Sequence, residues 1–120
     1  MATVISSDFE IAITLADGQG TTNLTQTGSG RTFRVVALEG TGDDTATQII
    51  SKVDANGVAT AVGSVTVDNA VFGLINSPGV MQADALFAAT DGIRLVRGVA
   101  NSTECKLICI AGDAPPMTET

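Results

Sequence analysis

The sequence predicts an all-β, single-domain antiparallel β-sandwich, jelly-roll-like, with about 7–9 short strands. Three observations lead to this fold class. Apolar and polar residues alternate with a period of two in several short stretches. Clusters of Gly, Asn, Asp, Ser and Thr separate these stretches about every ten residues, as turns do. Helical periodicity is nearly absent, and 120 residues suit one domain.

The first element is expected in FEIAITL, where the alternation is clearest. One face carries the four large apolar side chains, Phe9, Ile11, Ile13 and Leu15, and the other carries Glu10, Ala12 and Thr14. This pattern predicts a half-buried strand with all four large side chains in the core. A polar stretch with turn chemistry follows, and it has room for a short strand around Leu24.

The stretch TQTGSGRTFRVV, residues 25–36, contains GSGRT, which resembles the end of a phosphate-binding loop. That chemistry needs a helix whose N-terminal amides face the phosphates. Here TFRVVAL follows instead, and its β-branched and aromatic residues favour a strand. We therefore expect Gly28 and Gly30 to bend the backbone before a strand that begins at Thr32. Apolar side chains on both faces of this strand indicate a central position in its sheet.

Two hairpins are predicted further along the chain. Asn56 and Gly57, within DANG, tolerate positive φ and predict a hairpin between TATQIISKV and VATAVGSVTV. The second hairpin pairs DGIRLVRGV with ECKLICIAG across the turn ANST. Between them, two alternatives stay open: a strand over 71–75 followed by a helical turn at Ser77–Pro78, or two short strands around Pro78–Gly79.

The domain is expected to span 9–113, with an N-terminal arm over 1–8 and a flexible C-terminal tail over 114–120. Either end could order on a neighbouring protein, and the candidate interface residues there are Val4, Ile5, Pro115, Pro116 and Met117. The N-terminus has neither a basic leader nor a long apolar segment, and no apolar run reaches membrane-spanning length. These features predict synthesis in a cytoplasm and no membrane partner.

Composition narrows the function classes. Hydrophobic residues make up 44 %, but there is no Trp or Tyr and there are only four Phe, so the core must be aliphatic. Aliphatic side chains bury less area than aromatic ones, which favours added burial through association with copies of the chain or with a larger partner. The net charge of −7, with six scattered basic residues, excludes nucleic acid as a natural partner.

The residues of catalysis and metal binding are largely missing from the sequence. There is no His, most of the Asp residues lie in turns, and no Ser–His or Cys–His arrangement can be written, so we expect no enzyme and no cofactor. Asp43 and Asp44 fit a solvated turn better than a calcium loop. Cys105 and Cys109 lie four residues apart on one strand face, too far for a disulfide, and are expected to be buried thiols. By alternation Arg94 and Arg97 face opposite sides of their strand and form no patch, and both are expected as solvated edge arginines.

The order of elements resembles a known family. RTFRVVALEG is followed by the acidic turn GDD, the DANG hairpin, GSVTVDN, SPGV and the closing DGIRLVRGVANSTECKLICIAGD. From Arg31 to Asp113 the chain is similar to small β-sandwich decoration or cement proteins of tailed-bacteriophage heads. The resemblance implies a non-enzymatic virion protein that binds the major capsid protein on the outer capsid surface, as a trimer or dimer, and stabilises the head.

Three alternatives remain beside this interpretation. The chain could belong to a phage tail or fibre, or it could be a cellular β-domain of another role. It could also be a carbohydrate-binding β-sandwich module, although such sites commonly use Trp and Tyr faces, and this chain has neither.

Overall fold

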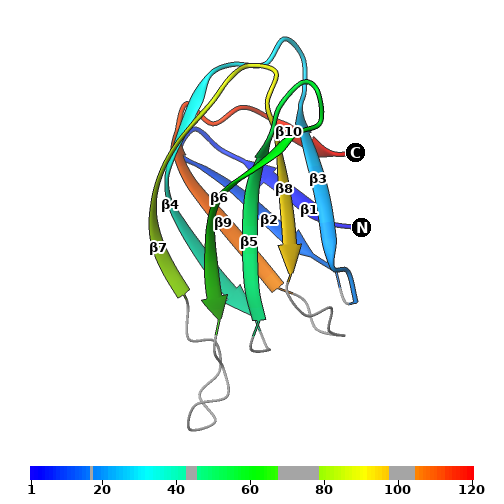
Figure 1. Ribbon diagram of the computed structural model, residues 1–120, viewed down its shortest axis with the longest axis vertical. Coiled ribbons are helices and arrows are strands. Elements are labelled where there is room, and N and C mark those ends of the chain that lie inside the picture. Colours follow the sequence, from blue (N-terminus) through cyan, green and yellow to red (C-terminus); the bar gives the residue numbers. More distant parts are fainter. Residues whose placement is uncertain (17, 43–45, 68–78, 98–104) are drawn as a thin grey trace, which may run out of the picture.

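The computed structural model describes residues 1–16, 18–42, 46–67, 79–97 and 105–120 (Figure 1). Within them the chain forms ten β-strands. In order these are β1 (Thr3–Ser6), β2 (Glu10–Leu15), β3 (Thr21–Gln26), β4 (Phe33–Gly42), β5 (Ala46–Val53), β6 (Ala59–Val67), β7 (Gly79–Phe87), β8 (Gly92–Arg97), β9 (Cys105–Gly112) and β10 (Met117–Glu119). The stretch proposed as a strand or helical turn over 71–78, and the Asp43–Asp44 turn, lie outside the described residues.

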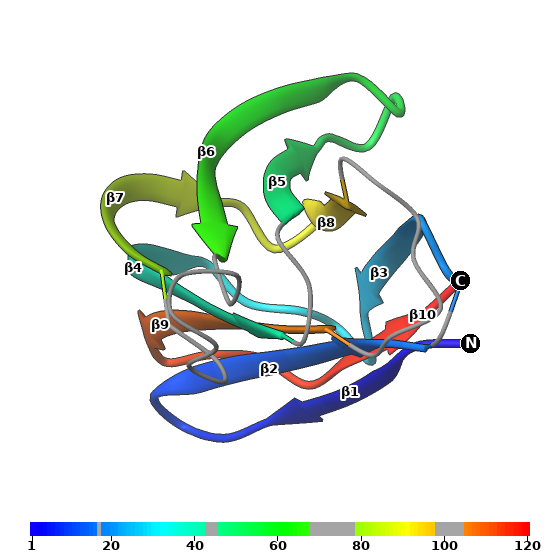
Figure 2. The same ribbon diagram turned by 90° about the horizontal axis from the view of Figure 1, so that it is seen from below.

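The strands form two antiparallel five-stranded sheets. Sheet A has the order β1-β2-β9-β4-β7, and sheet B has the order β10-β3-β8-β5-β6. The eight strands from β2 to β9 pair as nested partners: β2 with β9, β3 with β8, β4 with β7 and β5 with β6. Such nested pairing across two sheets defines a jelly roll. The predicted fold class is therefore confirmed, and Figure 2 shows the two layers end on.

The core lies between the sheets and is built from their inward-facing residues. In β2 the period-two pattern places Ile11, Ile13 and Leu15 at 0 % exposure. The Phe33 and Phe87 rings stack with centroids 4.7 Å apart. Aliphatic residues supply most of the rest: Leu24, Val35, Leu38, Ile50, Ile93, Leu95, Cys109, Ala111, Ala114 and Met117. As the composition predicts, few aromatic side chains contribute.

The predicted position of Phe9 in the core is wrong. Its side chain is 74 % exposed. Strand β2 begins one residue later, at Glu10, so Phe9 lies beyond the end of the ladder although its carbonyl still accepts from the Ala111 N–H. The alternation continues to Phe9 in the sequence, but no strand of sheet B covers that position.

The hairpin at DANG is confirmed. Strands β5 and β6 pair from Val53↔Ala59 to Ala46↔Val67. The Asp54 carboxylate accepts from the N–H groups of Asn56 and Val58, at 2.9 Å each. Of the two turn residues, only Gly57 takes positive φ (+82°). The turn therefore needs the glycine in the left-handed region and uses Asp54, rather than Asn56, to fix the backbone.

The second predicted hairpin is wrong. Strand β8 pairs with β3 and β5 in sheet B, while β9 pairs with β2 and β4 in sheet A. The chain crosses from one sheet to the other between them. Both strands are central in their sheets and have two neighbours each, so neither has a free side for the other.

The chain ends form strands where an arm and a tail were expected. β1 pairs with β2 at one edge of sheet A, and β10 pairs with β3 at the adjacent edge of sheet B. Pairing supplies partners for their backbone groups, and Met117, only 6 % exposed, adds apolar burial. The described residues therefore form ten strands, where 7–9 were predicted. Eight of them make up the jelly roll and lie within the predicted domain of 9–113, and β1 and β10 are the other two.

No described segment forms a helix with the length and apolar character needed to span a membrane.

Candidate functional site: two outer sheet faces

The outer face of sheet A carries four exposed apolar side chains, with the charged Glu10, Arg34 and Asp84 among them. Its most exposed large side chains are Ile5 on β1 (65 %), Leu86 on β7 (50 %), Val36 on β4 (46 %) and Ile110 on β9 (37 %). They point outward because their neighbours in sequence point into the core, as Cys109 and Ala111 do on either side of Ile110. Exposed aliphatic side chains on one sheet face are typical of contact surfaces.

A β-bulge gives Val36 its position. Opposite β9, Val35 pairs with Ala111 and Ala37 with Ile110, so that Val36 is an extra residue in β4. The pairing of β4 with β7 is irregular at the same place, but there the extra residue belongs to β7. Val35 and Leu38 both reach the core at 0 % exposure, and Val36 with Ala37 spans the outer side between them. The bulge thus turns two consecutive residues toward solvent next to Ile110, the register partner of Ala37.

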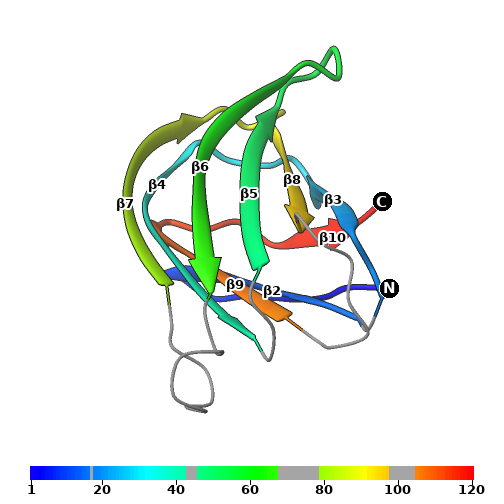
Figure 3. The same ribbon diagram turned by 60° about the horizontal axis from the view of Figure 1, so that its bottom comes forward.

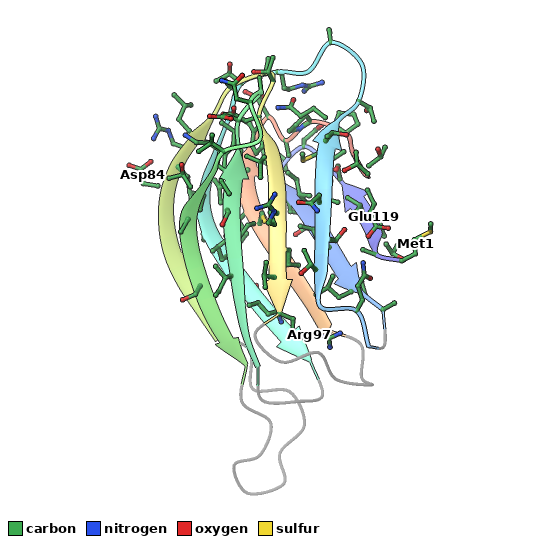
Figure 4. All side chains as sticks on the ribbon, turned by 45° about the vertical axis from the view of Figure 1, so that its right-hand side comes forward. Met1, Asp84, Arg97 and Glu119 are labelled. Atoms are coloured by element: carbon green, nitrogen blue, oxygen red, sulfur yellow. The ribbon has the colours of Figure 1, made fainter. Side chains whose placement is uncertain are left out.

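Charged groups border this apolar surface at β7. Arg34 and Leu86 are register partners on the outer face, and the Arg34 guanidinium forms an ion pair with Asp84. Both charged side chains are largely exposed, so the pair contributes little to stability. Figure 4 shows Asp84 at the margin of the molecule.

The outer face of sheet B carries the exposed Ile49 beside a polar row. Asn23, Arg94 and Ser51 are register partners and form a row across β3, β8 and β5. The Arg94 Nε–H donates to the Asn23 Oδ1 at 2.8 Å. This bond fixes the plane of the guanidinium, and among the described residues its two terminal nitrogens have no further partner. The row therefore presents oriented hydrogen-bond donors on an open face.

Arg97 is not on the surface, contrary to the expectation of a solvated arginine. It is 3 % exposed and continues the inward pattern of Ile93 and Leu95. Its guanidinium donates to the carbonyl oxygens of Ala16 and Gln19 and so holds the connection between β2 and β3. Arg94, by contrast, is on the outer face, so the prediction that the two arginines face opposite sides is confirmed.

The five residues chosen from the sequence as interface candidates do not lie together. Ile5 and Pro116 are exposed, Val4 is partly buried against the core, and Pro115 and Met117 are buried. Only Ile5 belongs to the apolar outer face of sheet A. The sequence analysis did not identify Val36, Leu86 and Ile110. For Val36 and Ile110 a signal was available, because RTFRVVAL and ECKLICIAG carry apolar residues on both faces of the strand.

No group of three or more His, Cys, Asp or Glu side chains that could hold a metal occurs among the described residues. Cys109 is a free thiol in the core, and burial raises its pKa to about 12. A thiol in this state is a poor nucleophile, because the thiolate is the reactive form.

No protein-family model and no curated protein matches this chain. Among solved structures, it is similar to CsCBM6-3 from Clostridium stercorarium in complex with cellobiose, at 13 % identity and a TM-score of 0.49, over 94 % of this chain and 82 % of that one. It is also similar to a CBM4 structure, at 15 % identity and a TM-score of 0.44, over 99 % and 78 % of the two chains.

A third similar structure is the N-terminal cellulose-binding domain of Cellulomonas fimi β-1,4-glucanase C, at 14 % identity and a TM-score of 0.43. The match covers 98 % of this chain and 82 % of that one. All three are carbohydrate-binding domains and none is a phage protein. Since every one of these TM-scores is below 0.5, the likeness assigns neither a ligand nor a binding residue to this chain.

Proposed function

We propose that this chain is a non-catalytic binding domain that docks on another protein through the apolar outer face of sheet A. The observation that carries the proposal is the exposure of Ile5, Val36, Leu86 and Ile110 on one sheet face of a chain whose net charge is −7. Burying these side chains against a partner removes apolar area from water, at about 25 cal/mol per Å². The face needs no reactive group to do this.

Decoration of a bacteriophage head is the specific form of this function that the sequence resemblance suggests. A protein that binds only the assembled capsid stabilises it by mass action, without catalysis. A surface on which aliphatic and charged side chains are mixed fits such a contact with a coat protein. This role remains a prediction.

The experiment is co-sedimentation with expanded capsids of a tailed phage that lack a decoration protein. Saturation at a fixed copy number per coat subunit supports the proposal, and absence from the pellet at all concentrations counts against head decoration. Ile110→Thr is the test variant and Ile49→Thr is its matched control, because both isoleucines are similarly exposed (37 % and 39 %) but lie on opposite sheets. We expect about tenfold weaker binding for Ile110→Thr alone.

The polar row on sheet B supports a second candidate, carbohydrate binding. Sugar hydroxyls both donate and accept hydrogen bonds, and the Arg94 guanidinium, the Asn23 amide and the Ser51 hydroxyl offer complementary groups on adjacent strands. The preset orientation of Arg94 lowers the entropy cost of such a contact. Since no aromatic side chain of the described residues belongs to this row, the affinity is expected to be low.

A glycan array followed by calorimetry with cellobiose and longer cello-oligosaccharides tests this candidate. Arg94→Ala is expected to abolish measurable binding, whereas Arg31→Ala, at an exposed arginine outside the row, should leave it unchanged. Absence of any signal on the array at millimolar sugar removes carbohydrate from consideration and leaves protein docking untouched.

A further inference from the structure

The start of β1 lies beside β10, so that both chain ends are at one side of the molecule (Figure 3). At this place the Ala2 nitrogen lies 3.1 Å from each oxygen of the Glu119 carboxylate. A backbone amide has a single hydrogen, which the two oxygens have to share. The geometry therefore suits a donor with more hydrogens than the amide that now stands there.

The Glu119 carboxylate is held in place by neutral donors. The Thr22 hydroxyl donates to it, and the Gln19 side-chain amide does so at 2.9 Å. These two contacts, in that order, are the main causes that lower the pKa of the carboxyl. Among the described residues, no Lys or Arg side chain forms an ion pair with it. Glu119 is thus an oriented anion with room for a positive charge at the Ala2 nitrogen.

The Met1 residue is not needed to hold Ala2 in this position. The Met1 side chain is 94 % exposed and points away from the strands in Figure 4. Its α-ammonium group forms no ion pair with Glu119 and makes only the smallest contribution to the lowered pKa of that carboxyl. Ala2, in contrast, packs against the core, and β1 pairs with β2 from Thr3 onward. Loss of Met1 therefore leaves the Ala2 nitrogen beside Glu119.

We propose that the Met1–Ala2 peptide bond is a modification site, and that its hydrolysis gives Ala2 an α-ammonium group that forms an ion pair with Glu119. One water molecule is consumed. Its oxygen joins the Met1 carbonyl carbon, the C–N bond breaks, and methionine leaves with a carboxylate. Both hydrogens of the water go to the Ala2 nitrogen, which becomes –NH₃⁺. The catalyst is a methionine-removing aminopeptidase, which needs a free α-amino group on Met1 and a small second residue such as Ala2.

The change at Ala2 replaces a neutral donor with one shared hydrogen by a charged donor with three. Hydrogen bonds between charged groups are about twice as strong as neutral ones, although solvent at this partly exposed position reduces the gain. The carboxylate raises the pKa of the ammonium in the folded chain, so the gain is complete below the unfolded pKa of about 8 and is lost as pH rises through the folded value. Gln19 and Thr22, the other groups that contact Glu119, do not titrate. The inference goes beyond the proposed function, since it involves no residue of the docking face.

Intact-mass spectrometry of the 120-residue chain, made in a bacterial cytoplasm, is the first test. We expect a mass that is lower than that of the whole sequence by one methionine residue. Retention of Met1 in most molecules overturns the proposal.

Urea unfolding then compares chains with and without Met1, each released from a fusion by a protease that leaves the chosen first residue. At pH 7, loss of Met1 should lower the equilibrium constant of unfolding about threefold in the natural chain and leave it unchanged in Glu119→Gln. Glu10→Gln, at an exposed carboxylate on β2, is the matched control and should keep the full effect. An equal effect of Met1 loss in Glu119→Gln and in the natural chain overturns the ion pair.

A comparison at high pH needs no substitution. At about pH 10.5 the Ala2 amine is neutral, so the natural chains with and without Met1 should be equally stable. Absence of the effect at pH 7, or its persistence at high pH, overturns the proposal. Capsid binding through sheet A is unaffected by either result.

Discussion

The backbone N–H of Ala2 donates to both carboxylate oxygens of Glu119, at 3.1 Å each. The same carboxylate accepts from the Gln19 side-chain amide at 2.9 Å and from the Thr22 hydroxyl. One side chain near the C-terminus therefore connects β1, β3, β10 and the loop between β2 and β3. In Figure 4 Glu119 and Met1 lie near each other at the same side of the molecule. The Thr22 bond is the largest cause that lowers the pKa of Glu119 from its usual 4.5, followed by those from Gln19 and Ala2.

Glu119→Gln is expected to lower the free energy of unfolding by about 1 kcal/mol, because it keeps the size of the side chain and removes the charge from several hydrogen bonds. Urea unfolding measures the change. Glu10→Gln is the control, since Glu10 is exposed on β2 and its side chain has no hydrogen-bond partner among the described residues. Equal stability of the two variants would contradict a role for the Glu119 contacts.

The lowered pKa of the Glu119 carboxyl predicts that the free energy of unfolding falls in acid. A carboxyl whose pKa is lower in the folded than in the unfolded state stabilises the fold above its unfolded pKa, and this stabilisation is lost as pH falls through the folded pKa. For Glu119 the loss begins near pH 4.5 and continues below it. Unfolding free energy measured down this range should fall more steeply for the natural protein than for Glu119→Gln. Parallel curves would show that the pKa of Glu119 is not lowered.

The buried Gln48 side chain is expected to make the fold less stable than an apolar side chain of the same length would. It is 1 % exposed, and neither its amide oxygen nor its amide nitrogen has a hydrogen-bond partner within the described part of the chain. Gln48→Met keeps the length of the side chain without the buried amide, so it should raise the free energy of unfolding by about 1 kcal/mol or more. The measurement is thermal or urea unfolding.

Gln26→Met is the matched control for that substitution. The Gln26 amide donates to the carbonyl oxygens of Ala88 and Asp91 and accepts from the Arg31 N–H. Losing these bonds should lower stability. If both substitutions lower it by similar amounts, the Gln48 amide is satisfied in solution and the expectation fails.

Local turn chemistry and strand periodicity predicted much of the fold. Asn56 and Gly57 located the β5–β6 hairpin because a turn of this kind depends on neighbouring residues alone. Alternation located the inward face of β2, since burial on one side of a sheet demands it. Periodicity also placed Arg97 with Ile93 and Leu95, but its charge led us to expect it in solvent. The carbonyl oxygens that compensate its burial come from a loop about eighty residues away in sequence.

The candidate site was less predictable, because it depends on which strands become neighbours. Strands β8 and β9 are joined by a short connection and both alternate, as hairpin strands do, yet each is central in a different sheet. The outward residues of β9 could lie beside those of β4 or those of β8. Which strand becomes the neighbour depends on how all the strands of the jelly roll pair, not on the local sequence. The bulge that turns Val36 outward arises from the pairing of β4 with β9, a strand about seventy residues away in sequence, and has no turn residue to mark it.

The two glycines of GSGRT provide a matched pair for testing backbone strain. Both have positive φ, +71° at Gly28 and +70° at Gly30. A Cβ at Gly28 would meet nothing within 4 Å, whereas one at Gly30 would lie 2.2 Å from the carbonyl oxygen of Ala89. Gly28→Ala should cost about 1 kcal/mol from backbone conformation alone. Gly30→Ala adds a steric overlap with backbone and should cost clearly more, about 3 kcal/mol or above. Equal costs in urea unfolding would show that the loop relaxes around the new methyl group.

Cys109 is expected to be inert while the protein is folded. Burial raises its pKa to about 12, so almost no thiolate is present at pH 8. In a Cys105→Ser background Cys109 is the only thiol of the chain. A disulfide reagent added to the native variant should give no reaction, and denaturant should release one equivalent. Adding Thr25→Cys, at an exposed position, should give one reactive equivalent under native conditions.

The raised pKa also means that Cys109 stabilises the fold below about pH 9 and that this contribution is lost as pH rises toward 12, because only the unfolded thiol ionises in that range. Rapid reaction of native Cys109 at pH 8 would show that the core at β9 opens to solvent.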